Sequence, residues 1–438
     1  MSEANDAATA SAWAALGGPA ELVDGVSYEP ASGVLPSRFP VREMARATVG
    51  ACSLAAAELL ARRNGGPVPE VRVSEAAVGT AFHSERHLRI DGRVPTVFAP
   101  LSGFWRASDG WVRTHANYPH HRTRLLASLG IHEDGELAEA LADRPAEEVQ
   151  ETVYAAGGLA VAVATKPTTT THPLVETRDL GGGRVLPRAT LPAEGVRVLD
   201  LTRVLAGPVA SRTLGLLGAD VLRVDAPDLV ESADTYADTG LGKRSTLLDL
   251  TASEDRRVFD DLLAEADVVL TGYRPGALDR LGLSPDALLE RRPGLVVGQL
   301  CAWGWSGPWA RRRGFDSLVQ AACGIAAAEG GERPGALPAQ ALDHGTGYLL
   351  GAAVLRALGE GGGRHVRFSL AGTASWLMND IHALPEDGPP FDPEPWLTEF
   401  PSPYGSLRHA LSPVNYAGGP VEWVKPPSTW GSDAPHWN

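Results

Sequence analysis

The stretch Val196-Arg-Val-Leu-Asp-Leu-Thr-Arg-Val-Leu-Ala-Gly-Pro208 joins a short β-branched run to a polar turn and then to small residues that suit a helix start. The same alternation continues along the chain. It predicts buried strands at 196–200, 219–225, 267–270 and 295–298 and helices at 206–217, 254–265 and 284–291. This pattern is typical of an α/β fold, in which helices cover both faces of a parallel sheet. Ligands of such sheets bind at the carboxyl ends of the strands, and the turn at 200–207 lies at the end of the first one.

Composition excludes several classes of protein. The chain has 438 residues, of which 44% are hydrophobic and 21% charged, as in an ordinary soluble globular protein. The net charge of −14, with no clustering of the bases, argues against a nucleic-acid partner. The three cysteines form no CxxC pair, so we expect neither a disulfide framework nor a metal cofactor. The sequence shows no apolar run of membrane-span length and no signal-peptide pattern, so we expect no membrane association and a cytoplasmic location.

An internal repeat is the most informative feature of the organisation. Residues 50–82 align without gaps to residues 345–377, and both copies contain the pattern Val-Arg-x-Ser, at 71–74 and at 366–369. Each copy is predicted to form a helix, a Gly-rich turn, a short strand and the start of another helix. The shared strand at identical spacing favours a duplication over chance similarity between two Ala-rich helices.

The remaining segments divide the chain by composition. Residues 99–180 contain a hairpin signal at 108–112 and a helical pattern at 122–129, which indicate a small α+β domain. The C-terminal segment is rich in Pro and Trp and is expected to pack as an extended strap over the body. The predicted division has five parts: an N-terminal arm (1–40), a spare helix-strand-helix unit (41–98), the small domain (99–180), a large domain (190–384) and a closing tail (385–438). We expect the arm to be loosely structured, with one short helix.

Common cofactor and nucleophile motifs are missing from the sequence. We find no GxGxxG fingerprint after a strand, no P-loop and no GxSxG elbow. The turn at 200–208 could bind a phosphate at a helix N-terminus, or its small residues could serve only close packing. The bases at 242–245, 273–280 and 311–313 are explained by an anionic ligand or by solvated surface charge. His115, His120 and His121 lack acidic neighbours at ligand spacing, so we interpret them as exposed polar histidines rather than as a metal site.

Seven motifs in fixed order resemble the class III CoA-transferase family, which also includes the α-methylacyl-CoA racemases. The resemblance implies a Rossmann-like large domain that binds coenzyme A, a smaller second domain and interlocked homodimers. The order of parts departs from the family pattern, because the spare unit and the small domain precede the large domain, as in a tandem fusion that lost segments. The motifs lie at 196–208, 217–224, 242–250, 273–283, 304–308, 314–316 and 343–347.

The same resemblance implies the site residues. The family nucleophile falls on Asp343, near a helix N-terminus whose partial positive charge favours an ionised carboxylate, although a plain N-cap would look the same. The equivalent position in the first repeat is Thr48, which cannot form an acyl anhydride. Backbone N–H groups that follow Asp343 are expected to stabilise an oxyanion. The positions that match family contacts to coenzyme A are Val204, Leu205, Ala206, Lys243, Arg280 and Arg313.

Three functions follow from these residues. The first is transfer of CoA between an acyl-CoA and a free carboxylic acid through aspartyl anhydride and aspartyl-CoA thioester intermediates. The second is an α-methylacyl-CoA racemase, which is disfavoured because Phe315 stands where racemases of the family have histidine; His344 is the nearby residue that could weaken this preference. The third is a degenerate CoA-binding subunit. We expect a homodimer in which residues 45–180 of one chain approach the CoA site of the other.

Overall fold

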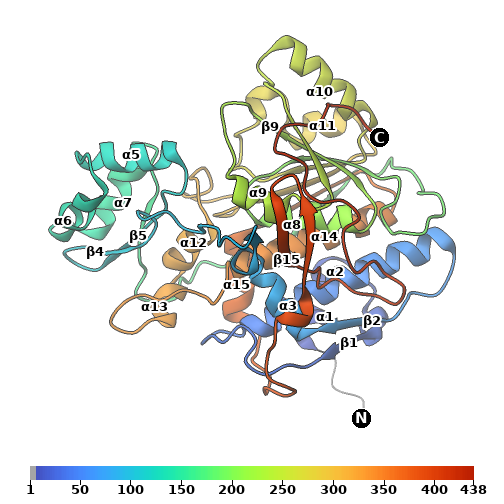
Figure 1. Ribbon diagram of the computed structural model, residues 1–438, viewed down its shortest axis with the longest axis horizontal. Coiled ribbons are helices and arrows are strands. Elements are labelled where there is room, and N and C mark those ends of the chain that lie inside the picture. Colours follow the sequence, from blue (N-terminus) through green and yellow to red (C-terminus); the bar gives the residue numbers. More distant parts are fainter. Residues whose placement is uncertain (1–5) are drawn as a thin grey trace.

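The computed structural model describes residues 6–438 and consists of a large α/β body with a smaller lobe beside it (Figure 1). The body is built on one seven-stranded sheet in the order β10-β9-β8-β11-β12-β13-β7. Every neighbouring pair is parallel except β13 and β7, which run antiparallel. The strands are β7 (Glu176–Asp179), β8 (Arg197–Leu201), β9 (Asp220–Asp225), β10 (Lys243–Leu247), β11 (Val268–Thr271), β12 (Val296–Cys301) and β13 (Arg364–Ser369).

Helices cover both faces of this sheet, so the predicted α/β fold is confirmed. Alternate residues of the strands enter two separate cores, since side chains of a strand point to opposite faces in turn. One face packs against α8 (Ala206–Leu216) and α14 (Ala341–Gly359). The other packs against α10 (Ser253–Glu265) and α11 (Pro285–Arg291), through apolar residues such as Phe259. The first strand predicted from sequence is displaced from the observed one by a single residue.

The internal repeat is visible in the structure. The first copy forms α2 (Val41–Asn64), β2 (Val71–Ser74) and α3 (Glu75–Phe82). The second copy forms α14, β13 and α15 (Leu370–Asn379) in the same order. The two strands differ in setting, because β13 belongs to the large sheet whereas β2 pairs only with β1 (Val26–Glu29).

The two long helices of the repeat, α2 and α14, pack side by side within one chain (Figure 1). A Cβ at Gly345 would lie 3.6 Å from Thr48, and one at Gly351 would lie 3.6 Å from Cys52 Sγ. The expectation that the spare unit docks on a partner chain is therefore wrong for this helix, because its apolar face is already buried against its own α14. Helix α2 is also long and apolar enough to match a membrane span by length and composition alone, but most of its surface is buried within the fold.

The smaller lobe is the expected α+β unit. Strands β4 (Phe104–Arg106), β5 (Trp111–Thr114) and β6 (Ala160–Ala162) form its sheet, and the predicted hairpin joins the first two. Helices α5 (Pro119–Leu129), α6 (Leu137–Ala142) and α7 (Ala146–Ala155) enclose a separate core with these strands. Its limits differ from the prediction, because β7 lies within 99–180 but joins the large sheet.

Both terminal segments are packed onto the body. The described part of the arm is not loose: α1 (Ala7–Ala15) buries Trp13 completely, and β1 pairs with β2. Residues 1–5 lie outside the described residues. In the tail, β14 (Leu397–Ser402) and β15 (Gly405–Ala410) form a hairpin that pairs with β3 (Arg89–Ile90). The extended segment beyond it passes over the large domain, as predicted, and anchors there through three indole N–H groups, of Trp423, Trp430 and Trp437.

Candidate active site

A cavity of about 400 Å³ contains the carboxylate singled out from the sequence. The large domain contributes the turn after β8 and the first residues of α12 (Asp316–Cys323) and α14. The segment 95–99, which leads into the smaller lobe, and residues around Tyr118 close the other side. The cavity therefore lies between the carboxyl end of the large sheet and the smaller lobe.

The turn after β8 is held in an unusual backbone conformation. Val204 has a φ of +71°, a region that β-branched residues rarely adopt and that costs on the order of 1–3 kcal/mol. The next helix starts so close to the turn that a Cβ at Gly207 would lie 2.3 Å from Thr202. Val204 and Leu205 line the cavity as expected, whereas Ala206 is buried in the first turn of α8.

Asp343 lies in the first turn of α14, and its backbone N–H donates to Asp316 Oδ2 over 2.9 Å. The other oxygen of Asp316 accepts a hydrogen bond from the amide of Gln320, one turn further along α12. Burial, followed by the charges of Asp316 and Glu85, raises the pKa of Asp343 well above its usual range. Burial also raises the pKa of Asp316 to about 6. At neutral pH these two carboxyls compete for a proton, which opposes the expectation that the helix N-terminus alone keeps Asp343 ionised.

The expected oxyanion donors are occupied. The N–H of His344 donates to the Gln340 carbonyl, and N–H groups from Gly345 onward lie within the helix and make its internal bonds. The expectation that they face the substrate is therefore wrong. Another donor lines the cavity: the hydroxyl of Ser317 is buried and has no hydrogen-bond partner among the described residues.

His344 does not line the cavity, but it contacts one residue that does. Its ring is fully buried, stacks on Phe82 with centroids 5.0 Å apart, and places Nε2 3.5 Å from Glu85 Oε2. Burial raises the pKa of Glu85, but its contact with His344 outweighs this and lowers the pKa overall. Glu85 itself lines the cavity, whereas His344 does not.

The histidines at 115–121 are not all exposed, which corrects our interpretation of them. His115 lines the cavity and stacks in parallel on Phe315 at 3.8 Å, and burial lowers its pKa to about 3. His121 is also buried, and the structure gives neither of its ring nitrogens a partner among the described residues. Only His120 is exposed. The smaller lobe brings His115 to Phe315 across 200 residues of sequence, which no local motif could indicate.

Lys243 does not reach the cavity. Its ammonium group is fully buried, 3.2 Å from Asp200 Oδ2 and 3.1 Å from the Pro208 carbonyl. Burial lowers the pKa of Lys243 to about 8, against the opposing charge of Asp200. These contacts join β10 to β8 and to the start of α8, so Lys243 holds the turn that lines the cavity.

The two remaining predicted bases are exposed. Arg280 lies in the short 3-10 helix Asp279–Leu281 and does not line the cavity. Arg313 lies just before α12, where burial and the nearby charges of Arg274 and Arg124 lower its pKa. The structure therefore gathers three guanidinium groups from the loop after β11, the loop before α12 and the smaller lobe.

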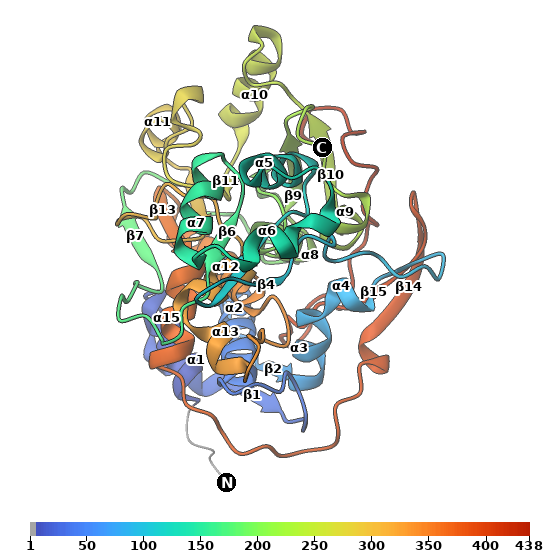
Figure 2. The same ribbon diagram turned by 90° about the vertical axis from the view of Figure 1, so that its left-hand side faces the viewer.

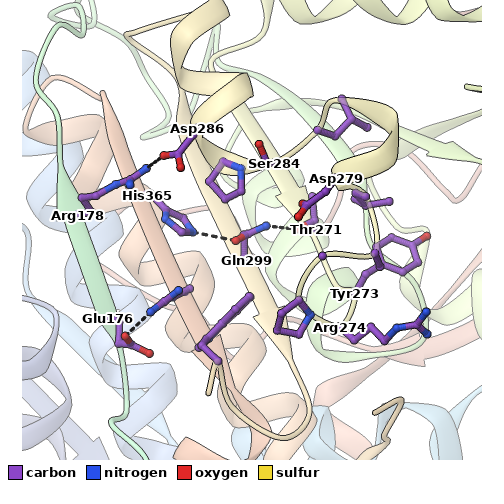
Figure 3. A pocket seen from close by; sticks show the side chains of 18 of the residues that line it. Glu176, Arg178, Thr271, Tyr273, Arg274, Asp279, Ser284, Asp286, Gln299 and His365 are labelled. Atoms are coloured by element: carbon purple, nitrogen blue, oxygen red, sulfur yellow. Dashed lines mark hydrogen bonds and ion pairs between the residues drawn. The ribbon is translucent and has the colours of Figure 1, made fainter. Parts of the chain in front are cut away.

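A second cavity, of about 420 Å³, lies over β12, β13 and β7 (Figure 3). Figure 3 shows His365, Gln299 and Thr271 in one hydrogen-bonded chain across three strands. Its charged side chains are largely paired with one another, as Arg178 is with Asp286 and Arg367 with Glu176. None of the six residues carried over from the family lines this cavity, so the cavity at Asp343 is the stronger candidate for the active site.

Comparison with known proteins identifies the segment that holds most of this site. Residues 193–393 match the family model described as CoA-transferase family III. This match covers a little under half of the chain and makes the segment similar to that family. It includes the turn after β8, α12 and α14, and therefore Asp343 and Asp316.

Curated proteins that resemble parts of this chain are named as CoA-transferases or acyl-CoA transferases. A probable fatty acyl-CoA transferase of Mycobacterium tuberculosis is 37% identical over 184 residues, which cover 38% of this chain and 46% of that protein. The acetyl-coenzyme A transferase nodX of Hypoxylon pulicicidum is 34% identical, over 44% of this chain and 35% of its own length. The succinate–glutarate CoA-transferase of Agrobacterium fabrum is 32% identical, and the match covers 44% of this chain and 54% of that protein. The chain thus spans about a third to a half of the curated relatives it matches.

Solved structures are matched over a similar share. A structure of the same Mycobacterium tuberculosis protein, titled there as a hypothetical protein, has 35% identity and a TM-score of 0.41, and the match covers 43% of this chain and 56% of that one. A CAIB/BAIF family protein from Brucella suis has 25% identity and a TM-score of 0.38, and the match covers 49% of this chain and 65% of that one.

Proposed function

We propose that the chain is a CoA-transferase that moves CoA from an acyl-CoA to a free carboxylic acid, with Asp343 as the nucleophile. One observation carries the proposal: Asp343 sits at a helix N-terminus inside a cavity, beside the strained turn at Val204 and away from any lysine or arginine that would hold it as an ion pair. A carboxylate kept only for structure would be expected to bind such a partner. The family of the segment supports the same activity.

The chemistry proceeds in four balanced steps. The Asp343 carboxylate attacks the thioester carbonyl, the C–S bond breaks, and CoA leaves as a thiolate from an acyl-aspartyl anhydride. The thiolate attacks the Asp343 carbonyl, which releases the donor acid and forms an aspartyl-CoA thioester. The acceptor carboxylate attacks that thioester to give a new anhydride and thiolate. The thiolate then attacks the acceptor carbonyl, which forms the new acyl-CoA and regenerates Asp343.

Each addition places negative charge on an oxygen, and the chain supplies a donor for it. We assign this role to the Ser317 hydroxyl, which is buried, lines the cavity and has no competing partner among the described residues. A donor fixed before the reaction stabilises the oxyanion without reorganisation. Asp316 has a positioning role, because it fixes the N–H of Asp343 and is itself fixed by Gln320.

Coenzyme A is proposed to enter along the turn after β8. Val204 and Leu205 provide an apolar edge for the pantetheine arm, and Lys243 holds that turn from behind. Arg313, with Arg274 and Arg124 near it, forms a basic group suited to phosphates. Arg280 is exposed on the loop after β11, where it could contact the nucleotide end.

The racemase alternative receives less support from the same geometry. Phe315 carries no proton, and His344 does not line the cavity. His115 does, but with a pKa of about 3 it is a weak base for removing an α-proton near neutral pH. A catalytically degenerate CoA-binding subunit would have no need to retain Asp343 in the cavity.

Replacement of Asp343 tests the proposal. Asp343→Asn and Asp343→Ala are expected to lower the rate of CoA transfer by at least about a thousandfold, since both remove the carboxylate that forms the anhydride and the thioester. CoA affinity by calorimetry and the circular dichroism spectrum are expected to stay near those of the parent. Asp261→Asn, an exposed change on α10 across the sheet, serves as the matched control. Transfer at the parental rate by Asp343→Ala would exclude Asp343 as the nucleophile.

A further inference from the structure

The charges that line the Asp343 cavity are all of one sign. Among the described residues, 6–438, no lysine or arginine lines it. Six carboxylates do, and they come from the short helix α4 (Ser84–His87) after the first repeat, from the loop and helix α9 (Ala233–Thr239) after β9, and from the starts of α12 and α14. They are Glu85, Glu231, Asp234, Asp238, Asp316 and Asp343.

The carboxylates divide into two groups by their partners. Those contributed by residues 231–238 are neutralised by arginines outside the cavity: Glu231 by Arg223 at 2.9 Å, and Asp238 by Arg212 at 3.2 Å. Asp234 is likewise paired with an arginine. At the reactive end Asp316 and Asp343 have no such partner among the described residues. Arg113 is attracted to Asp316 but does not line the cavity, so a second negative charge on a bound substrate would still meet mainly like charge among the lining residues.

The basic groups close to the cavity are turned to other contacts. The Arg203 guanidinium lies over the Tyr118 ring and donates to two backbone carbonyls, those of Leu229 and Val230. The Arg113 guanidinium does not line the cavity and lies 5.3 Å from the centre of the Phe98 ring, although its charge interacts with that of Asp316. The imidazole that does line the cavity, His115, is neutral near physiological pH because burial lowers its pKa.

The uncharged part of the wall combines neutral polar side chains, such as Asn117 and Thr235, with a larger apolar surface. The apolar residues come from the segment after the first repeat, the segment before the smaller lobe and the loop before α12; they are Leu88, Pro95, Val97, Phe98 and Phe315. Such a wall favours hydrocarbon, at about 25 cal/mol per Å² of apolar surface removed from water. Among the described residues it offers no positive charge to replace the hydration of an anionic tail.

We propose that the site selects monocarboxylic acids with an uncharged, apolar body, both as acyl donor and as acceptor, and excludes dicarboxylic acids. This inference rests on the proposed CoA transfer and adds its substrate class. It separates this chain from relatives whose names include succinate, glutarate and malate. Only the reacting carboxylate enters as an ion, and it becomes neutral when it forms the anhydride or the thioester.

Three acceptors of equal length test the proposal with the full chain and octanoyl-CoA as donor. Hexanoate, adipate and 6-aminohexanoate differ only in an apolar, anionic or cationic far end, and the new thioester is measured by mass spectrometry. We expect kcat/KM for hexanoate to exceed that for adipate by at least about tenfold, since like-charge contact and desolvation each cost more than that ratio requires. Equal or faster use of adipate would overturn the proposal, as would a preference for 6-aminohexanoate. Absence of every new thioester would instead refute the proposed transfer itself.

A substitution in the cavity wall tests whether charge causes this selection. Val97→Arg places a guanidinium in the apolar wall and should raise the adipate-to-hexanoate ratio of kcat/KM by at least about tenfold. Val97→Met, which adds length without charge, should keep the parental ratio. A ratio that is the same in both variants would show that charge does not set the selection.

Discussion

Asp316 and Asp343 share one buried environment but play different parts, and their coupling predicts how activity depends on pH. Asp343 must be ionised to attack, and its pKa is raised by burial, Asp316 and Glu85. Because an acid with a raised pKa loses its proton only at higher pH, kcat/KM should increase with pH through the apparent pKa of the pair. Asp316→Asn removes a like charge beside Asp343. The rising limb of the pH–rate profile should therefore move to lower pH by about one unit.

The pH–rate profiles of the parent and Asp316→Asn provide the test, with circular dichroism to confirm the fold. Gln320→Glu is the opposite change, since it adds a carboxylate next to Asp316 and should move the limb to higher pH. A limb that stays in place in both variants would show that these carboxyls do not control the ionisation of the nucleophile.

At the level of single residues, the sequence indicated Asp343, Val204 and Leu205 correctly as neighbours, because the motifs that carry them are local turns at strand and helix ends. It did not indicate the place of Lys243, since a basic residue near a ligand edge has the same sequence signature whether it faces the ligand or is buried against Asp200. The motif at 314–316 contains Asp316, but no local pattern indicates that its carboxylate accepts a hydrogen bond from the N–H of Asp343, because the two residues meet only in the folded chain.

Among the elements, the close crossing of α14 and α8 sets the position of Asp343. A Cβ at Gly347 would lie 2.5 Å from the Ala206 carbonyl and 2.8 Å from Val209. Gly347→Ala should therefore push the helices apart and destabilise the protein by about 1–3 kcal/mol, with loss of activity. Gly351→Ala is a matched control on the same helix, because its Cβ would make an ordinary contact at 3.6 Å.

Urea unfolding of the two variants measures this difference. Gly351→Ala should be neutral or slightly stabilising, since alanine is favoured over glycine in a helix by about 1 kcal/mol. Similar free energies of unfolding for both variants would contradict the assignment of Gly347 as the contact that fixes the crossing.

Most elements of the large sheet were predictable from sequence, because buried parallel strands are β-branched runs. Strand β7 was not, since its residues, Glu176–Asp179, are polar and half or fully exposed at the sheet edge. The sequence underestimated how ordered the N-terminal arm is, because glycine and proline break its periodicity. In the structure the buried Trp13 and the pairing of β1 with β2 hold the arm against the body. The repeat predicted the order of α2, β2 and α3 correctly but not the surface they cover.

For the whole molecule, the smaller lobe and the large domain of one chain meet at the same cavity. The loops around Phe98 and Tyr118 face the helix start that carries Asp343 (Figure 2 shows the lobe in front of the body). The site therefore contains both of its walls without a second chain. Specific activity should stay constant on dilution, whatever oligomer forms.

Assays from micromolar to low nanomolar protein, with sedimentation velocity at matching concentrations, measure this dependence. Activity that falls in parallel with the loss of a dimer would show that a partner chain completes the site. Constant activity in a monomer would show that one chain suffices.

The central claim is that Asp343 becomes covalently attached during transfer, and trapping tests it most directly. The full chain is incubated with octanoyl-CoA and hydroxylamine, digested and mapped by mass spectrometry. The account predicts a hydroxamate on the peptide that contains Asp343, dependent on octanoyl-CoA and absent from Asp343→Asn. Sustained transfer with an unmodified Asp343 peptide, or a hydroxamate on another carboxylate, would contradict it.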